Sequence, residues 1–286
     1  MTYIEHLITM LSTEQPKIAR MPPREQLGVL YMTLRNAVEV LVANDDKEHI
    51  HNIGISYDVV SEIIRGRSDF YKVGSQFGKH LDRTNLDVPC RLLPVEASEA
   101  YYVGFPDGMV FKSQPNDYHR NCLASVQLSK DGTTRSLAML FPDMTSDGRY
   151  KESGTYVVLP LTPDLTIGEC IDKLNEQNFE ISEGTKRLVA FVAKSILYIK
   201  SGDPDLQREM GKWSTSKKLK KIKGANRENC RFDTIKVGYG FHGKTFNVDE
   251  TMVSGHFRWQ PYGPDRGLIK LIWIDEHVRT FDTTGQ

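Results

Sequence analysis

Long apolar runs and clustered cysteines are both missing from this sequence. No stretch of about 18 or more apolar residues occurs, so we expect no membrane span. The segment Met1–His6 shows no basic region followed by an apolar run, so we expect no secretory signal. The four cysteines are far apart and form no C-x-x-C pair; they are Cys90, Cys122, Cys170 and Cys230. This usage predicts reduced thiols in a cytoplasm, with neither a disulfide framework nor a zinc site.

A net charge is also missing. The sequence carries 37 Lys and Arg residues against 37 Asp and Glu residues. Because the molecule as a whole has no field that would attract nucleic acid, any such attraction must be local. With 286 residues, the chain is long enough for one large domain or two modest ones, with a substantial core.

The common catalytic and cofactor motifs do not occur either. There is no H-E-x-x-H, P-loop, G-x-S-x-G or cluster of carboxylates. Gly238–Gly243 matches G-x-G-x-x-G, but Lys244–Asp249 does not resemble the helix that a dinucleotide site needs, so we interpret the match as a bend between strands. Four aspartates are interpreted as turn residues rather than metal ligands: Asp107, Asp131, Asp143 and Asp147. We therefore expect no cofactor and no metal.

The N-terminal part, residues 1–88, has the pattern of helices. Apolar residues recur at helical spacing from Arg24 to Ala43, and Pro22-Pro23 is suited to starting that helix. A second, shorter helix is predicted over Tyr57–Ile64, with a polar connection between the two.

Residues 89–205 are predicted to form an antiparallel sheet with packed helices. Short strand-like runs are separated by Asp-Gly turns; they are Tyr101–Phe105, Met109–Phe111, Cys122–Leu128, Ser136–Phe141 and Thr155–Leu161. Thr166–Glu169 is a capping box that opens a helix to about Asn178. Lys186–Ile199 is apolar nearly all round, which predicts a helix buried against the sheet.

Residues 206–231 are predicted to be a basic mobile linker. The cations proposed to bind nucleic acid there are Lys212, Lys217, Lys218, Lys220, Lys221, Lys223, Arg227 and Arg231. Such a run can neutralise phosphates and give an affinity that depends steeply on salt. The alternative is a solvated linker with no partner, and Trp213 alone gives little support for a platform on which bases stack.

The last part, residues 232–286, is predicted to contain a β-hairpin joined to the central sheet. The hairpin spans Ser254–Ile274, with its turn at Tyr262–Gly267. Strand alternation puts Phe257 and Trp259 on an anchoring face. The residues proposed for recognition or an effector role are His256, Arg258, Trp259, Gln260 and Arg266. The whole chain is thus predicted to be an α+β protein with N-terminal helices, a central antiparallel sheet with a buried helix, and a C-terminal hairpin.

The same hairpin also allows a catalytic hypothesis. His256, Arg258 and Lys270, with His277 nearby in sequence, could supply the acid–base and phosphate-binding groups of a metal-independent ribonuclease. The alternative is the ordinary polar face of a half-exposed sheet. The sequence leans against an enzyme, because no carboxylate or metal motif accompanies these residues.

Taken in order, these segments resemble the AcrVA-two-like anti-CRISPR proteins carried by phages and plasmids. The resemblance runs through Leu93-Pro94, the Phe105–Phe111 segment, Tyr156–Pro160 with its following helix, and Asp203–Asp205. It ends in the Gly255-His256-aromatic motif with Arg258-Trp259-Gln260-Pro261.

This resemblance implies a counter-defence protein in the cytoplasm of a bacterial host. Family members recognise the nascent N-terminal peptide of the type V-A CRISPR nuclease and promote loss of its messenger RNA. The implied partners are therefore a nascent polypeptide, such as that of a CRISPR nuclease, and the ribosome or messenger RNA, with no membrane. An RNA-cleaving enzyme and a nucleic-acid-binding regulatory phage protein remain the alternatives.

Overall fold

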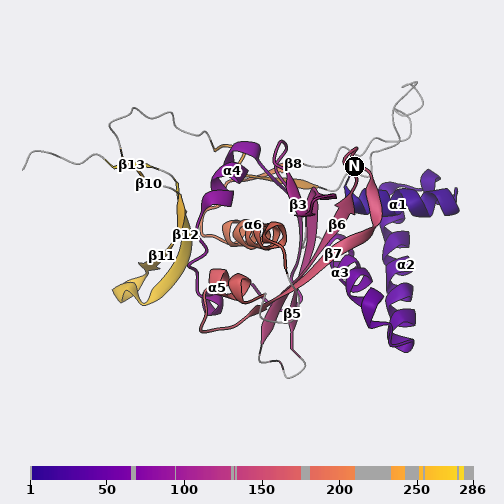
Figure 1. The fold of residues 1–286 in the computed structure, drawn as a ribbon, viewed down its shortest axis with the longest axis horizontal. Coiled ribbons are helices and arrows are strands. Elements are labelled where there is room, and N and C mark those ends of the chain that lie inside the picture. Colours follow the sequence, from indigo (N-terminus) through magenta and orange to yellow (C-terminus); the bar gives the residue numbers. More distant parts are fainter. Residues whose placement is uncertain are drawn as a thin grey trace, which may run out of the picture.

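A computed structural model shows a central sheet between two layers of helices, with a hairpin outside one of them (Figure 1). It describes residues 2–65, 69–93, 95–129, 132, 134–174, 181–209, 233–241, 251–253, 255–275 and 277–279. Within these ranges, no helix is both long and apolar enough to span a membrane. The molecule has the α+β architecture predicted from the sequence.

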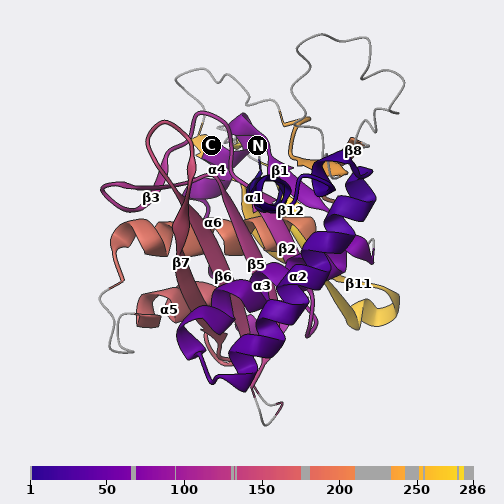
Figure 2. The same cartoon turned by 90° about the vertical axis from the view of Figure 1, so that its right-hand side faces the viewer.

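Three helices cover one face of the sheet (Figure 2). They are α1 (Tyr3–Glu14), α2 (Pro23–Ala43) and α3 (Lys47–Ile64). Thr2 and Glu5 form a capping box at the start of α1, and Pro23 occupies the first position of α2. The predicted short helix Tyr57–Ile64 begins earlier, at Lys47, because the Asp46 side chain accepts from the His49 amide and caps it.

The central sheet is mixed rather than purely antiparallel. Its strands are β1 (Phe70–Val73), β2 (Ala100–Gly104), β3 (Phe111–Gln114), β4 (Asp117–His119), β5 (Asn121–Leu128), β6 (Arg135–Met144), β7 (Tyr150–Leu161), β8 (Leu206–Glu209) and β9 (Thr234–Val237). They follow the order β3-β4-β6-β5-β2-β1-β9-β8, and β7 pairs with β6. Strand β1, which lies within the part predicted to be helical, runs parallel to both β2 and β9.

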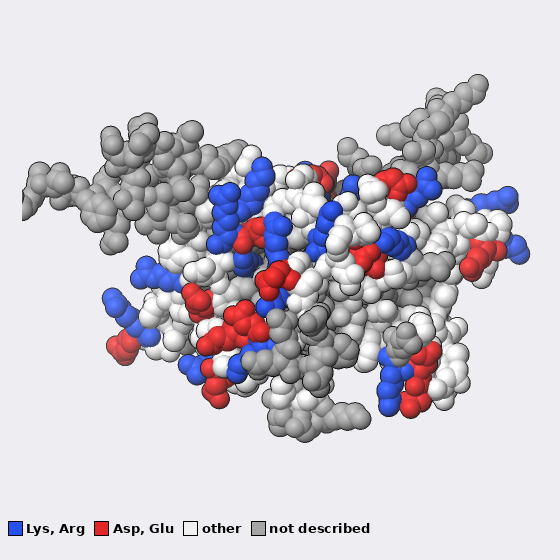
Figure 3. Space-filling model, viewed as in Figure 1, with Lys and Arg blue, Asp and Glu red and all other residues white. Residues whose placement is uncertain are grey.

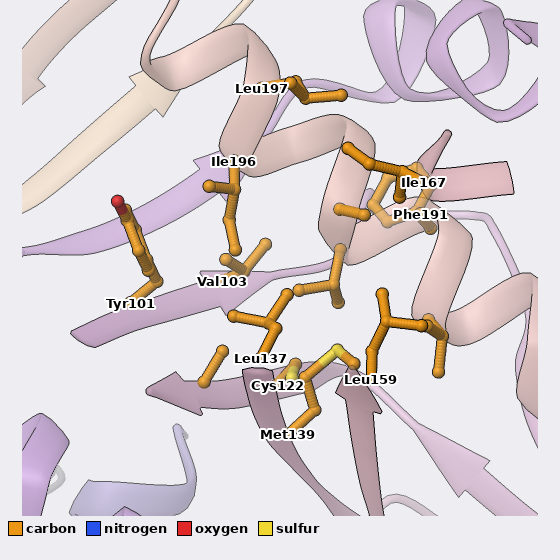
Figure 4. Close-up of a cluster of buried hydrophobic side chains, with 14 of the residues drawn as sticks. Tyr101, Val103, Cys122, Leu137, Met139, Leu159, Ile167, Phe191, Ile196 and Leu197 are labelled. Carbon is orange, nitrogen blue, oxygen red and sulfur yellow. The ribbon is translucent and has the colours of Figure 1, made fainter. Parts of the chain in front are cut away.

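Both faces of the sheet are buried. Tyr102 packs toward α1–α3, whereas Tyr101 lies in the core on the opposite face. Both tyrosines are therefore core residues, because helices cover each side. Figure 4 shows the second core, where Val103, Leu137 and Met139 from the strands face helix side chains such as Phe191.

The second layer of helices consists of α4 (Ser75–Arg83), α5 (Ile167–Asp172) and α6 (Glu183–Ile199). The capping box Thr166–Glu169 forms as predicted, although α5 ends at Asp172. Helix α6 is the predicted buried helix, and Ser182 caps it. It lies close to β3, since a Cβ on Gly184 would overlap the Lys112 carbonyl oxygen. This close contact fixes the helix over one end of the sheet.

The segment predicted as a basic linker begins with a strand. Residues Leu206–Glu209 form β8, which pairs antiparallel with β9 at the sheet edge. The rest of that segment falls within residues 210–232, outside the described residues. After β9, Gly238 adopts a positive φ of 65°, which confirms a glycine bend at this point.

Strand β9 links the C-terminal part to the central sheet, whereas the hairpin forms a two-stranded sheet of its own among the described residues. The hairpin comprises β11 (His256–Tyr262) and β12 (Leu268–Ile274), with the turn around Pro264–Arg266 as predicted. Short strands β10 (Thr251–Val253) and β13 (His277–Arg279) pair beside it. In Figure 1 the hairpin lies beyond α4 and α6, on the side away from the central sheet. The division of the chain at residues 88, 205 and 231 stays a prediction.

Candidate recognition surfaces

The inner face of the hairpin is packed against the body of the protein. The Trp273 ring lies 5.7 Å from the rings of both Phe77 and Tyr198, centroid to centroid. Two backbone groups add to this attachment, since the Gly255 amide donates to His80 Nε2 and the Gly202 amide donates to the Leu271 carbonyl. The hairpin is therefore held in one orientation by aromatic packing and by hydrogen bonds at its edge.

Strand register decides which hairpin residues face outward. Phe257 pairs with Trp273 and Trp259 with Leu271, so all four share the inner face. Trp259, one of the residues proposed for recognition, is thus half-buried against the core. The outer face carries His256, Arg258, Gln260 and Tyr262 from β11, and Leu268, Lys270, Ile272 and Ile274 from β12. Alternation predicted this division correctly.

The tip of the hairpin is exposed on both faces. Leu268 and Ile269 keep 53% and 59% of their surface accessible, and Tyr262 is also exposed. Lys270 lies 5.7 Å from the Tyr262 ring centroid, which is a cation–π distance. Arg266 sits in the turn with a positive φ of 55°. The tip therefore offers cations and apolar side chains together.

The proposed catalytic residues share the outer face but form no closed site. Pairing of Arg258 with Ile272 and of Gln260 with Lys270 makes Arg258 and Lys270 diagonal neighbours, with His256 further along β11. His277 belongs to β13, in a different two-stranded sheet. Among the described residues, no group of three or more His, Cys, Asp or Glu side chains is suited to holding a metal.

The proposed nucleic-acid-binding cations lie outside the described residues. These are Lys212, Lys217, Lys218, Lys220, Lys221, Lys223, Arg227 and Arg231. The residues that bound the segment are placed, because Glu209 pairs with Thr234 at the sheet edge. On the described surface seen in Figure 3, basic and acidic side chains are interspersed. That face shows no extended patch of one sign.

A buried Ser–His–Asp arrangement was missed from the sequence. Ser113 Oγ lies 2.8 Å from His119 Nε2, and His119 Nδ1 lies 3.2 Å from the Pro142 carbonyl oxygen and 3.7 Å from Asp143 Oδ1. Asp143 is therefore a buried residue of β6 and not the predicted turn residue. Ser113 is only 3% exposed and also accepts from the Thr155 hydroxyl. The arrangement ties strands together and offers no accessible nucleophile.

Of the other three aspartates, two lie in turns and one falls outside the part of the chain that the structure describes. Asp107 and Asp147 lie in turns as predicted, and Asp107 also forms an ion pair of 2.8 Å with Lys72. Asp131 lies outside the described residues.

Two cysteines that are distant in sequence meet in the core. The sulfurs of Cys90 and Cys170 are 3.5 Å apart, a contact that their wide spacing in the sequence did not indicate. Burial, with the neighbouring thiol, raises the pKa of Cys90 to about 12. Cys122 is also buried and free, and burial raises its pKa. The thiols of Cys90 and Cys122 are therefore protonated packing groups at neutral pH.

A polar hollow lies between α3 and the end of β5. Its volume is about 470 Å³, and its walls include Asp58, Glu62 and Ser125. The Ser125 hydroxyl donates to Asp58, and Arg65 pairs with Glu62 at 2.7 Å. Burial is the main cause that raises the pKa of Asp58. Both carboxylates therefore already have partners.

A second hollow, of about 520 Å³, opens where the start of α1 meets the ends of β1, β2 and β5. One wall is the segment Phe105–Phe111. This segment carries part of the family resemblance seen in the sequence, but the sequence alone assigned it no role. Arg120, directly before β5, and Asn121, the first residue of β5, also line it. Their position between a turn and a strand was the one signal in the sequence that could have marked them.

The fold is shared with an anti-CRISPR protein of solved structure. The structure titled "Crystal structure of AcrVA2" is similar with a TM-score of 0.53 and 12% identity, over 98% of this chain and 100% of that one. The model of the AcrVA2-like family, described as the anti-CRISPR type V subtype A2 family, matches residues 71–275. The chain belongs to this family, and its role is accordingly counter-defence against CRISPR. No curated protein matches the sequence significantly.

Proposed function

We propose that this protein is an adaptor that recognises the nascent N-terminal peptide of its target and causes loss of the messenger RNA being translated. Membership of a type V subtype A2 anti-CRISPR family supports a CRISPR nuclease as that target. The body of the protein binds the peptide, while the hairpin and the basic segment Lys212–Arg231 meet the ribosome or the messenger. The chain needs no catalytic chemistry of its own for this role.

The observation that carries the proposal is the outer face of the hairpin. Its strand residues are neutral or cationic, with Arg258 and Lys270 exposed and no carboxylate among them. Lys and Arg side chains supply the phosphate contacts of nucleic-acid-binding surfaces. Because Trp273 holds the inner face against α4 and α6, this surface keeps a fixed orientation. A rigid cationic face suits an RNA-rich partner such as the ribosome.

Ribosomes stalled on defined nascent chains test the proposal directly. Purified protein is mixed with ribosomes that display the N-terminal segment of a type V-A nuclease, or an unrelated segment of equal length. We expect retention on the first complex alone. Equal retention on both, or on neither, would remove the basis for nascent-peptide recognition.

Recoded messages then separate the peptide from the RNA. A synonymous recoding keeps the peptide and changes the messenger, whereas a compensated frameshift keeps nearly all of the messenger and changes the peptide. We expect the protein to lower the level of the synonymous message and to spare the frameshifted one. The opposite result would assign recognition to the RNA.

A charge reversal tests the hairpin. Arg258→Glu with Lys270→Glu should preserve peptide binding and abolish loss of the messenger. Lys47→Glu is the matched control, because that side chain is 80% exposed on α3, across the sheet from the hairpin. Full activity of the hairpin variant would contradict an effector role for this face.

A ribonuclease is the second candidate, favoured by the register that puts His256, Arg258 and Lys270 on one face. Labelled RNA incubated with the purified protein and with His256→Ala decides this case. Cleavage that His256→Ala removes would replace the adaptor with an enzyme.

A regulatory protein that only binds nucleic acid is the remaining alternative. Reversing Lys217, Lys218, Lys220 and Lys221 tests it, because RNA binding independent of any nascent peptide should then fall.

A further inference from the structure

The hollow beside α1 contains a buried amide group that lacks a partner. Asn121 is 3% exposed, and its Nδ2 lies 2.6 Å from the Tyr150 hydroxyl. Its Oδ1 has no hydrogen-bond partner among the described residues. In this orientation Nδ2 donates to Tyr150, and Oδ1 is left without a donor. A buried polar atom without a partner is costly, and a bound ligand would remove that cost.

The floor of the hollow is set by strand register. Lys72, Gly104 and Asn121 form one row across β1, β2 and β5. The Phe70 ring covers Gly104, where a Cβ would overlap it. The Phe70 ring also packs 4.7 Å from Tyr102, centroid to centroid, which fixes its position. An aromatic floor with an unsatisfied amide oxygen beside it is suited to a peptide side chain and its backbone.

The wall formed by Phe105–Phe111 is held in place. The Lys72 ammonium lies 2.8 Å from Asp107 Oδ2, and the Ser75 hydroxyl donates to the Asp107 carbonyl. At its far end Val110 is 59% exposed on the rim. Since the charges of Lys72 and Asp107 offset one another, the net charge of the hollow is determined by its other residues.

That charge comes from Arg120. The guanidinium lies near Gly148 and the Tyr150 hydroxyl, and the described residues include no carboxylate paired with it. His119, which also lines the hollow, has a pKa lowered by burial and is neutral at pH 7. A carboxylate carries one negative charge and matches one guanidinium, whereas a phosphate carries more negative charge than Arg120 alone neutralises.

We infer that this hollow is the peptide-binding site, and that it takes an extended segment in which an apolar side chain stands next to an acidic one. The apolar side chain lies on Phe70, and the acidic side chain pairs with Arg120. The peptide backbone forms the hydrogen bond that the Asn121 amide lacks. A backbone supplies N–H groups, so it can donate to the Asn121 oxygen. This inference rests on the proposed function, because it takes the ligand to be a peptide.

The test uses acetylated, amidated tetrapeptides titrated into the full chain and followed by NMR. One probe contains Phe-Glu and its partner contains Phe-Gln. We expect the Glu probe to bind about fivefold to tenfold more tightly, in keeping with a partly exposed charge-assisted hydrogen bond. A third probe, neutral but with a free C-terminal carboxylate, distinguishes a terminal carboxylate from a side-chain carboxylate. Preference for that probe would overturn the side-chain assignment.

Variants locate the binding on the protein. Arg120→Gln should abolish the preference for Glu over Gln, and Arg149→Gln should not, because Arg149 pairs with Asp147 on the adjacent turn and does not line the hollow. Val110→Asp, at an exposed position, should weaken both probes. Binding that is absent, equal for Glu and Gln, or unaffected by Arg120→Gln would overturn the inference.

The outcome is separable from that of the proposed function. If stalled ribosomes are retained equally by the native protein and by Arg120→Gln, the adaptor role stands and this hollow is the wrong site. If no nascent chain is retained but the Glu probe binds through Arg120, the hollow is a peptide site and the adaptor role fails.

Discussion

Removal of the Trp273 ring should release the hairpin from the body of the protein. Besides Phe77 and Tyr198, the ring contacts Phe257 at a centroid distance of 4.9 Å. A Trp→Ala change at a fully buried site costs about 3–5 kcal/mol. Because Trp273 is half-buried, with its indole N–H bonded to exposed Asp275, we expect about 2–3 kcal/mol for Trp273→Ala.

Hydrogen exchange at the Gly202 amide measures this release. That amide donates to the Leu271 carbonyl across the interface, so it is protected only while the hairpin is docked. A loss of 2–3 kcal/mol corresponds to exchange about 30- to 150-fold faster. Leu268→Ala, at the exposed tip of the same strand, should change the rate by about twofold or less. Exchange in Trp273→Ala close to the native rate would refute the argument that ring packing holds the hairpin.

Three further predictions concern packing and titration. Gly184→Ala should lower the free energy of unfolding by about 1–3 kcal/mol, because the new Cβ would overlap a backbone carbonyl oxygen. Gly54→Ala should raise it by about 0.5–1 kcal/mol, because its new Cβ would have no atom within 4 Å and alanine favours a helix. Urea unfolding of both variants checks the two signs. With its pKa raised to about 12, Cys90 should resist iodoacetamide until the protein is unfolded, and native-state labelling detected by mass spectrometry would contradict this. Burial lowers the pKa of His119, so the unfolded chain binds a proton more readily than the folded one. The free energy of unfolding should therefore fall as the pH drops below about 6.5. In urea titrations at several pH values, His119→Gln should make that fall shallower.

The sequence correctly predicted those helices and strands whose position depends on neighbouring residues alone. Pro23 starts α2, the capping box Thr166–Glu169 starts α5, and strand alternation divided the hairpin faces correctly. In each case the physical cause acts within a few residues along the chain. Helix α6 was predicted for the related reason that apolar residues on all sides require burial on all sides.

What the sequence did not show depends on distant partners. Strand β1 is only four residues long, and both of its neighbours come from far along the chain. Likewise, His119 and Asp143 come close to each other only because β4 and β6 pair in the sheet. The hollow that we assign to the peptide combines three strands with the start of α1. The position of Asn121 after a turn does not show which strands and which helix surround it in the fold.

The position of β1 between β2 and β9 also affects how this chain folds as it is made. Phe70 pairs with both Tyr102 and Thr234, so one edge of β1 has no partner until the last fifth of the chain has left the ribosome. Closing so long a loop is slow, and an open strand edge invites pairing with other chains. A chain truncated before β9 would therefore expose a bare edge at the middle of its sheet, and we expect such fragments to aggregate.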